Sequence, residues 1–196
     1  MEDNSSNDKK QTNIKKTTYA GVLLALGIIL PQAFHIFGTN TGMTFLPIHI
    51  PILLAGAILG GTYGGIIGII VPLVSSLLTG MPAVPKLWFM LFELGVYGFA
   101  MGILIKKCNV YLALILTMIL GRIAYALSLV AGVSLLGMNA PFMNSAAFIA
   151  GLTQGIPGML IQIVVIPILY IRLKEGGLLF AEQTRKSKKD TTATKS

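Results

Sequence analysis

The chain has 196 residues, of which 54% are hydrophobic and 11% are charged, and its formal net charge is +8. A soluble domain contains about a quarter charged residues, so this composition indicates an integral membrane protein and excludes an ordinary soluble domain. The basic residues flank apolar segments, where topology signals lie, which argues against nucleic-acid binding. The single cysteine, Cys108, excludes an internal disulfide and a thiolate zinc cluster.

Three parts follow one another along the chain. Residues 1–16 are polar, and we expect a disordered cytoplasmic tail there. Residues 17–174 are predicted to form a six-helix membrane domain, and residues 175–196 a basic cytoplasmic tail. No Asp, Glu, Lys or Arg occurs from Thr17 to Pro85. That stretch alone is long enough for about three spans, because about 20 apolar residues cross a bilayer.

The first predicted span, Thr17–Leu30, contains a pair of small residues one helical turn apart. Gly21 and Ala25 have the small-xxx-small spacing that lets two membrane helices approach closely. This spacing is compatible with packing inside the chain and with docking to another subunit.

The next apolar stretch, Ile48–Leu78, is too long for one span and short for two, at about 46 Å if it were a single helix. We therefore expect a hairpin of two short helices that turns at residues 60–65. Three more spans are predicted over Leu87–Ile105, Val110–Leu136 and Ser145–Ile171, the last interrupted at residues 155–158. Short segments interrupted by Gly and Pro are a pointer to substrate sites in transporters.

The sequence thus predicts an all-α integral membrane protein with six transmembrane helices. An even number of spans places both termini on one side. Of the 15 Lys and Arg residues, 13 lie in the tails or at Lys106 and Lys107, whereas Lys86 alone lies in the opposite loops. By the positive-inside rule, we expect both termini in the cytoplasm and the protein in the cell membrane.

Two charged residues, Glu93 and Arg122, lie inside apolar segments, where a charge costs a few kcal/mol unless it has a partner or a water-lined cavity. Counting along each helix places Glu93, Arg122 and Gln154 about 9, 12 and 14 Å below the outer boundary. We therefore expect these three side chains to converge in a solute-binding cavity open to the outside. The alternative is a buried ion pair that only fixes helix register.

Four further residues are candidates for the same cavity. His49 lies between two prolines at the outer mouth of the second span, although an interfacial histidine is often only solvated. Trp88, Tyr97 and Tyr125 could stack on a flat ring, whereas Trp88 could instead be an interfacial anchor.

Asn139 and Asn144 lie in a loop that could fold over a ligand. No catalytic pattern accompanies these polar residues: the sequence has no GxxxxGK[ST] phosphate loop, no GxSxG elbow and no HExxH. We therefore expect a protein that is not an enzyme and that carries no cofactor and no metal.

Three stretches resemble the substrate-binding S components of energy-coupling factor (ECF) vitamin transporters. They are FLPIHIPILLAGAILGGTYGGIIGIIVPLVSSLLTGMP (residues 45–82), FELGVYGFAMGIL (92–104) and GRIAYAL (121–127). The resemblance implies a binding protein that works with a transmembrane coupling subunit (T component) and two ATPase subunits, which use ATP. In the family, an AxxxA pattern on the first span faces the coupling subunit, and here Gly21-xxx-Ala25 stands in its place. Family ligands are held by the outer loops and by spans four to six, which here carry Glu93, Arg122 and Gln154.

The ligand class is less closely determined. An arginine favours a carboxylate-bearing vitamin such as nicotinate or pantothenate. A pyridoxine-like or pyrimidine precursor stays open, because Glu93 could neutralise Arg122. Two other functions are considered: a membrane scaffold without a solute, and a self-sufficient secondary carrier, for which the chain lacks paired halves.

Overall fold

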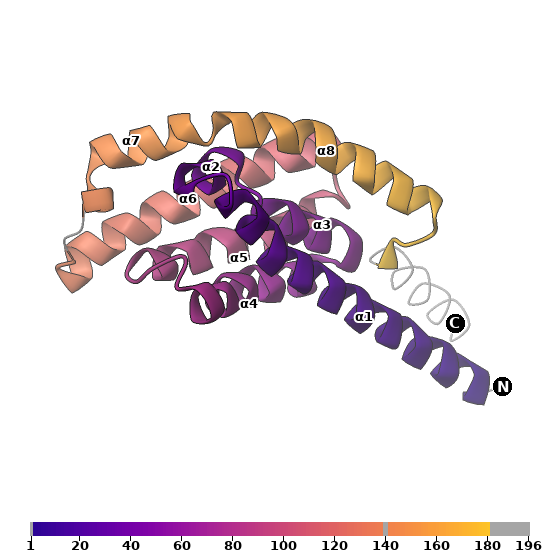
Figure 1. Ribbon diagram of the computed structural model, residues 1–196. Coiled ribbons are helices and arrows are strands. Elements are labelled where there is room, and N and C mark those ends of the chain that lie inside the picture. Colours follow the sequence, from indigo (N-terminus) through magenta and orange to yellow (C-terminus); the bar gives the residue numbers. More distant parts are fainter. Residues whose placement is uncertain (1, 139–140, 181–196) are drawn as a thin grey trace.

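The computed structural model describes residues 2–138 and 141–180, and the secondary structure there is helical. The helices are α1 (Glu2–His35), α2 (Thr39–Phe45), α3 (His49–Leu59), α4 (Gly61–Thr79), α5 (Lys86–Leu104), α6 (Val110–Leu136), the short 3₁₀ helix η1 (Pro141–Met143), α7 (Ser145–Gln154) and α8 (Ile156–Glu175). Their arrangement is shown in Figure 1.

Six helical stretches among the described residues are long and apolar enough to cross a membrane. They are Lys10–Phe34, Thr41–Leu59, Gly61–Thr79, Lys86–Leu104, Val110–Leu135 and Ile156–Glu175. The predicted all-α fold with six spans is confirmed. The second stretch combines α2 and α3, and the predicted hairpin turns at Gly60, whose φ of 101° interrupts the helix between α3 and α4.

Helices α3, α4 and α5 form the centre of the molecule, and glycines bring their backbones into contact. A Cβ atom on Gly98 would overlap the carbonyl of Gly64, and one on Gly68 would overlap that of Leu94. Between membrane helices the packing of small residues is a main source of association. The buried side chains Ile52, Leu53 and Leu94 fill the remaining space.

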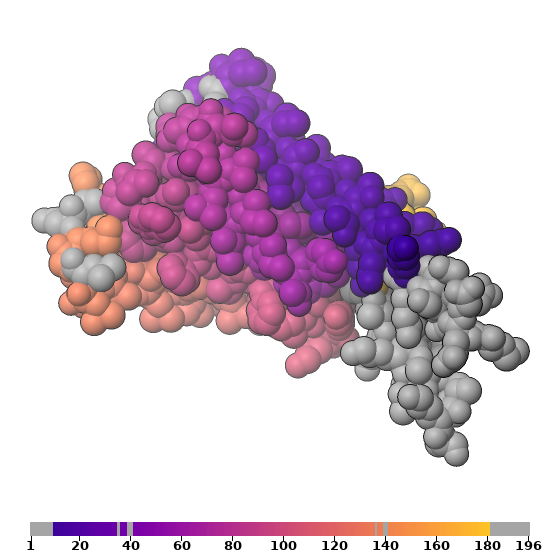
Figure 2. All heavy atoms as spheres, turned by 90° about the horizontal axis from the view of Figure 1, so that it is seen from below, coloured from indigo at the N-terminus to yellow at the C-terminus, as the bar shows by residue number. Residues whose placement is uncertain are grey.

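The other helices surround this centre. Helix α1 runs along the flank of α3 and α4, as the indigo-to-violet ridge in Figure 2 shows, while α6 packs on α5 and α8 packs on α3 and α6. The rings of Tyr19 on α1 and Phe180, just beyond α8, lie 5.3 Å apart at one end of the bundle. Lys16 and Lys106 also lie near each other there, so this is the basic end of the molecule.

The connection between α4 and α5 lies at the opposite end. Ser75 and Ser76 donate hydrogen bonds to the carbonyls of Met81 and Pro82, at 3.0 and 2.9 Å. These bonds hold the connection against the last turn of α4. Lys86 begins α5 beside it, and Lys106 is about 30 Å away by helical rise.

Two predicted boundaries differ from the structure, and a third is only partly covered by it. Residues 2–16 belong to α1 instead of a disordered tail, and the hydroxyls of Thr17 and Thr18 donate to carbonyls one turn earlier, which continues the helix into the polar residues. Pro31 lies inside α1 and does not end it, because a single missing N–H is tolerated in a membrane helix. Of the predicted C-terminal tail, residues 181–196 lie outside the described residues.

The sixth predicted span is also divided differently. Ser145–Ile171 contains two helices, α7 and α8, and α8 alone is long enough to cross a membrane. Gln154 therefore lies before the last span begins, and not about 14 Å inside it as the count from Ser145 predicted.

Candidate functional site

A cavity of about 640 Å³ lies at the end of the bundle opposite the basic end. A volume of this size is within the range of sites for small organic ligands. Its walls come from α2, the first residues of α3, the connection from α4 to α5, the first two turns of α5, the middle of α6, and α7. The apolar side chains and prolines of the lining include Pro31, Met43, Leu46, Pro47, Ile48, Met81, Pro82, Val84, Pro85, Met90, Phe142, Phe148 and Leu152.

An ion pair forms the polar floor of this cavity. Arg122 Nη1 on α6 donates to Glu93 Oε1 on α5 at 2.9 Å. The Glu93 side chain is 5% exposed and that of Arg122 is 18% exposed, and both residues line the cavity. Arg122 Nε and Nη2 are buried and have no hydrogen-bond partner within residues 2–138 and 141–180. The pair therefore borders an open volume and keeps unused N–H donors, which a purely structural ion pair would not need.

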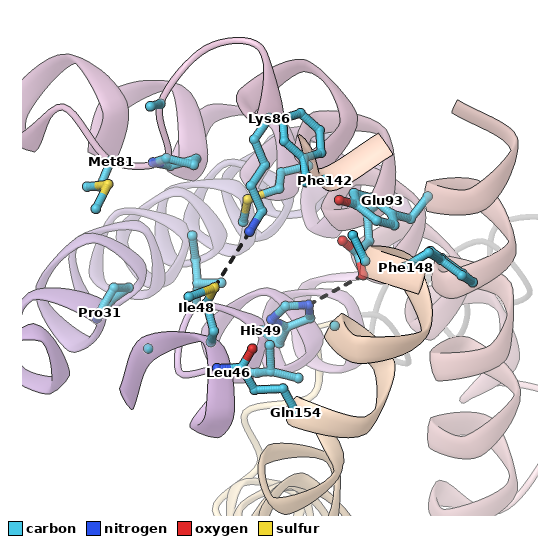
Figure 3. Close-up of a pocket in the computed structure, with 18 of the residues that line it drawn as sticks. Pro31, Leu46, Ile48, His49, Met81, Lys86, Glu93, Phe142, Phe148 and Gln154 are labelled. Carbon is cyan, nitrogen blue, oxygen red and sulfur yellow. Dashed lines mark hydrogen bonds and ion pairs between the residues drawn. The ribbon is translucent and has the colours of Figure 1, made fainter. Parts of the chain in front are cut away.

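His49 lies next to this pair. Its Nε2 atom is 3.9 Å from Glu93 Oε1, the contact drawn as a dashed line in Figure 3. The residue is only 2% exposed, and both ring nitrogens are buried with no hydrogen-bond partner in the part of the chain that the structure describes. The solvated interfacial histidine considered from the sequence does not match this burial. The edge of its ring meets Tyr97, with the centroids 4.9 Å apart.

Lys86 forms a second charged position in the lining. It is the first residue of α5, and its Nζ atom lies 3.8 Å from Met43 Sδ, as the second dashed line in Figure 3 shows. A thioether sulfur is a weak acceptor. None of the ion pairs found among residues 2–138 and 141–180 includes Lys86.

Gln154 and Tyr125 also line the cavity, so the predicted convergence of Glu93, Arg122 and Gln154 is present. Gln154 reaches the cavity from the last turn of α7. It therefore lines the cavity although its depth inside the last span was predicted wrongly. Tyr125 on α6 stacks with Phe148 on α7, with ring centroids 6.1 Å apart and planes inclined by 16°. Whether these side chains contact a ligand stays a prediction.

Three of the remaining predicted residues, Tyr97, Trp88 and Asn144, do not line the cavity. Tyr97 is buried behind His49 and donates to the carbonyl of Met118 at 3.4 Å. Trp88 is 50% exposed on the outside of α5, as expected of an interfacial anchor. Asn144 caps α7 by accepting from the N–H of Ala147 at 2.7 Å, and Asn139 lies outside the described residues.

The wall formed by α2 and its connection to α3 depends on two residues of α8. A Cβ atom on Gly158 would be 2.6 Å from the carbonyl oxygen of Phe45, so glycine is needed for this approach. Gln162 Nε2 donates to the carbonyl of Leu46 at 3.4 Å, and Leu46 has a left-handed φ of 49°. Sequence reasoning did not identify this wall, because no local pattern links residues so far apart in the chain.

Sequence reasoning also missed Lys86 and Phe148 as cavity residues. Lys86 is the one basic residue outside the basic clusters and the apolar segments, and that isolation was a usable signal. Phe148 carries no such signal, because phenylalanine is common in any membrane helix. Its place in the lining follows from the break between α7 and α8 at Gly155.

The two residues predicted to dock a partner lie on the exposed face of α1. A Cβ atom added to Gly21 would meet nothing within 4 Å, and Ala25 is exposed one turn later. Packing inside this chain therefore does not account for the small residue at Gly21.

Comparison with known proteins gives one match. Neither the curated proteins nor the solved structures include a significant match to this chain. Residues 15–170, however, match the family described as ECF transporter, substrate-specific component. The matched region starts within α1 and ends within α8, so it includes the whole cavity, four complete spans and most of the first and last spans. This chain therefore belongs to the family of substrate-specific components of ECF transporters.

Proposed function

We propose that this chain captures a small water-soluble vitamin or vitamin precursor in the cavity between α2, α5, α6 and α7. Members of its family are transport proteins that act with a transmembrane coupling subunit and an ATPase module. The chain would bind the solute outside the cell, with both termini in the cytoplasm, and deliver it inward together with those partners. ATP is then used by the partner subunits, and this chain needs no cofactor.

One observation carries the proposal: a buried charged pair lines a cavity of ligand size and has N–H groups without a hydrogen-bond partner among the described residues. Arg122 Nε and Nη2 have no partner, and both nitrogens of His49 are likewise unsatisfied. Leaving a buried donor without a partner costs about 1–3 kcal/mol, so a ligand that satisfies these groups gains that free energy on binding. A scaffold without a solute offers no reason for this arrangement.

The charges of the lining favour an anionic ligand. Lys86 and Arg122 contribute two positive charges and Glu93 one negative charge, so with neutral His49 the cavity carries a net charge of +1. A vitamin carboxylate such as nicotinate or pantothenate would neutralise it. A pyridoxine-like or pyrimidine precursor is the alternative ligand, since Glu93 already neutralises Arg122.

Mass spectrometry of the compounds that co-purify with the full chain in detergent tests the function directly. We expect one small organic molecule in a near-stoichiometric amount. We further expect Arg122→Ala to lower its affinity about a hundredfold or more, because the substitution removes the donors and leaves Glu93 as an unpaired buried charge. Arg122→Lys should restore little, since an ammonium cannot reproduce the guanidinium fork.

Lys107→Ala is the matched control, because Lys107 is an exposed cation at the basic end. It should retain the molecule as the wild-type chain does. Wild-type protein that carries no small molecule and binds none of the water-soluble vitamins would contradict the proposed function and favour the scaffold.

A further inference from the structure

The two cations of the cavity differ in how far their charges are already compensated. Arg122 has a carboxylate at 2.9 Å, whereas the nearest polar contact found for Lys86 is a thioether sulfur at 3.8 Å. The Lys86 ammonium nevertheless lies in a half-buried position in the lining. A partly desolvated cation without a counter-ion attracts an anion more strongly than one that is already paired.

An anion at Arg122 would meet a specific obstacle. It would lie beside the Glu93 carboxylate, which is 5% exposed and held by the same guanidinium. Two carboxylates at one buried position repel each other, and one of them then tends to take up a proton. At Lys86 the incoming anion lies farther from this carboxylate. Glu93 acts on Lys86 only through a longer-range charge interaction, because none of the ion pairs within 4 Å among the described residues joins the two side chains. They are seven residues apart on α5, roughly 10 Å of helical rise.

The groups around Glu93 suit a neutral polar head instead. The unpartnered nitrogens of Arg122 are donors, and the two ring nitrogens of His49 are further hydrogen-bonding groups beside them. His49 Nε2 lies 3.9 Å from Glu93 Oε1, and Arg122 Nη1 donates to the same oxygen. Donors and acceptors are therefore close together in the cavity floor. Apolar side chains, among them Met90 and Phe148, line the same cavity, and Met90 lies one helical turn after Lys86 on α5.

From this arrangement we infer that Lys86 binds the anionic group of the ligand, while Arg122, Glu93 and His49 bind a neutral hydrogen-bonding head at the other end. The inference rests on the proposed function and deepens it by defining the ligand class. That class is a small monoanion whose carboxylate is separated from its polar head by an apolar or planar spacer. By the same inference, Lys86 is the residue that makes the cavity prefer an anionic ligand to a neutral one.

Two pairs of probes separate charge from shape: nicotinate with nicotinamide, and pantothenate with its neutral alcohol, pantothenol. Calorimetric titration of the full chain in detergent gives, for each pair, the ratio of the neutral Kd to the anionic Kd. We expect a wild-type ratio of about ten or more for at least one pair, as hydrogen bonds to charged groups are the stronger ones. Lys86→Gln should reduce that ratio to about one, and Lys86→Arg should keep it.

The comparison variant is the double substitution Glu93→Gln with Arg122→Gln, which removes the floor pair and leaves the net charge of the cavity unchanged. It should weaken the binding of both members of a pair and keep their ratio. A ratio that is higher in Lys86→Gln than in the double variant would overturn the inference and assign the anion to Arg122. If the double variant does not fold, the ratios of Lys86→Gln and Lys86→Arg decide, and equal ratios overturn the inference.

Failure of the inference and failure of the proposed function are distinguishable. Wild-type protein that prefers the neutral member of each pair, or binds none of the four probes, overturns the anionic class. The proposed function would still stand if a different small molecule co-purifies with the chain.

Discussion

The interface between α4 and α5 and the exposed face of α1 use the same residue spacing in opposite ways. On α4, Gly64 and Gly68 are one turn apart, and a Cβ atom on either would overlap backbone atoms of α5. On α1, Gly21 and Ala25 have that spacing too, but a Cβ atom on Gly21 would meet nothing within 4 Å. Small residues one turn apart therefore indicate a close helix approach without specifying the helix that approaches. Where the folded chain leaves the space empty, the partner is expected to be another subunit.

The largest effect is expected at the α4–α5 interface. Gly98→Ala places a methyl group against the carbonyl of Gly64, and neither backbone can withdraw without separating the two helices. Overpacking a core typically costs about 1–3 kcal/mol, and a backbone clash should lie at or above that range. We expect the variant to lose its monodisperse peak in size-exclusion chromatography in detergent.

Gly98→Ala should also lose the co-purified ligand, since α5 carries Lys86 and Glu93. A well-folded Gly98→Ala protein with wild-type thermal stability would show that α4 and α5 can move apart at little cost. The close approach of these helices would then not require glycine, and their interface would not differ from the open face of α1 in this respect.

An intermediate effect is expected at Gly121, on the face of α6 that packs against Tyr97 of α5. A Cβ atom there would overlap the ring of Tyr97, which supports His49 through their edge-to-face contact. The ring can shift only by displacing His49, so Gly121→Ala should cost about 1–3 kcal/mol of stability. It should also weaken ligand binding about tenfold or more. Thermal unfolding and calorimetric titration of the same sample measure both.

Tyr97→Phe is the matched control for Gly121→Ala. It removes only the 3.4 Å hydrogen bond to Met118 and keeps the ring in place. It should cost about 1 kcal/mol, the usual net contribution of one hydrogen bond, with affinity nearly unchanged. An affinity loss equal to that of Gly121→Ala would mean that the hydroxyl, and not the position of the ring, supports His49.

The smallest effect on the isolated chain is expected on α1. Gly21→Leu adds a side chain to an open surface and should leave the melting temperature and ligand affinity at wild-type values. If this face docks to the coupling subunit, the same substitution should abolish co-purification with that subunit and uptake of the ligand by cells. Val22→Leu, at an adjacent exposed position that already has a branched side chain, is the control and should retain both.

The contrast between α1 and α4 also shows where prediction from the sequence ends. Each small-residue pair was recognisable, yet internal packing and external docking could not be distinguished for Gly21. The proximity of Glu93 and Arg122 was predictable because consecutive antiparallel spans bring residues of similar depth together, whereas Gln154 lines the cavity from α7, outside the last span. Lys86 was seen as an isolated cation but was not placed in the cavity. Its role depends on Met43 and on the compensated charge of Arg122, both distant in the sequence.

The sequence alone determined that the chain is a six-span helical membrane protein, because hydropathy and the bilayer thickness set the number and length of its helices. It also determined that a buried acid and base lie at similar depth. Only the tertiary structure decided that this pair borders a cavity, that Lys86 lines the same volume outside the ion pairs of the described residues, and that a Cβ atom on Gly21 would have open space around it. These features depend on contacts between side chains of different helices, for which local sequence patterns hold no information.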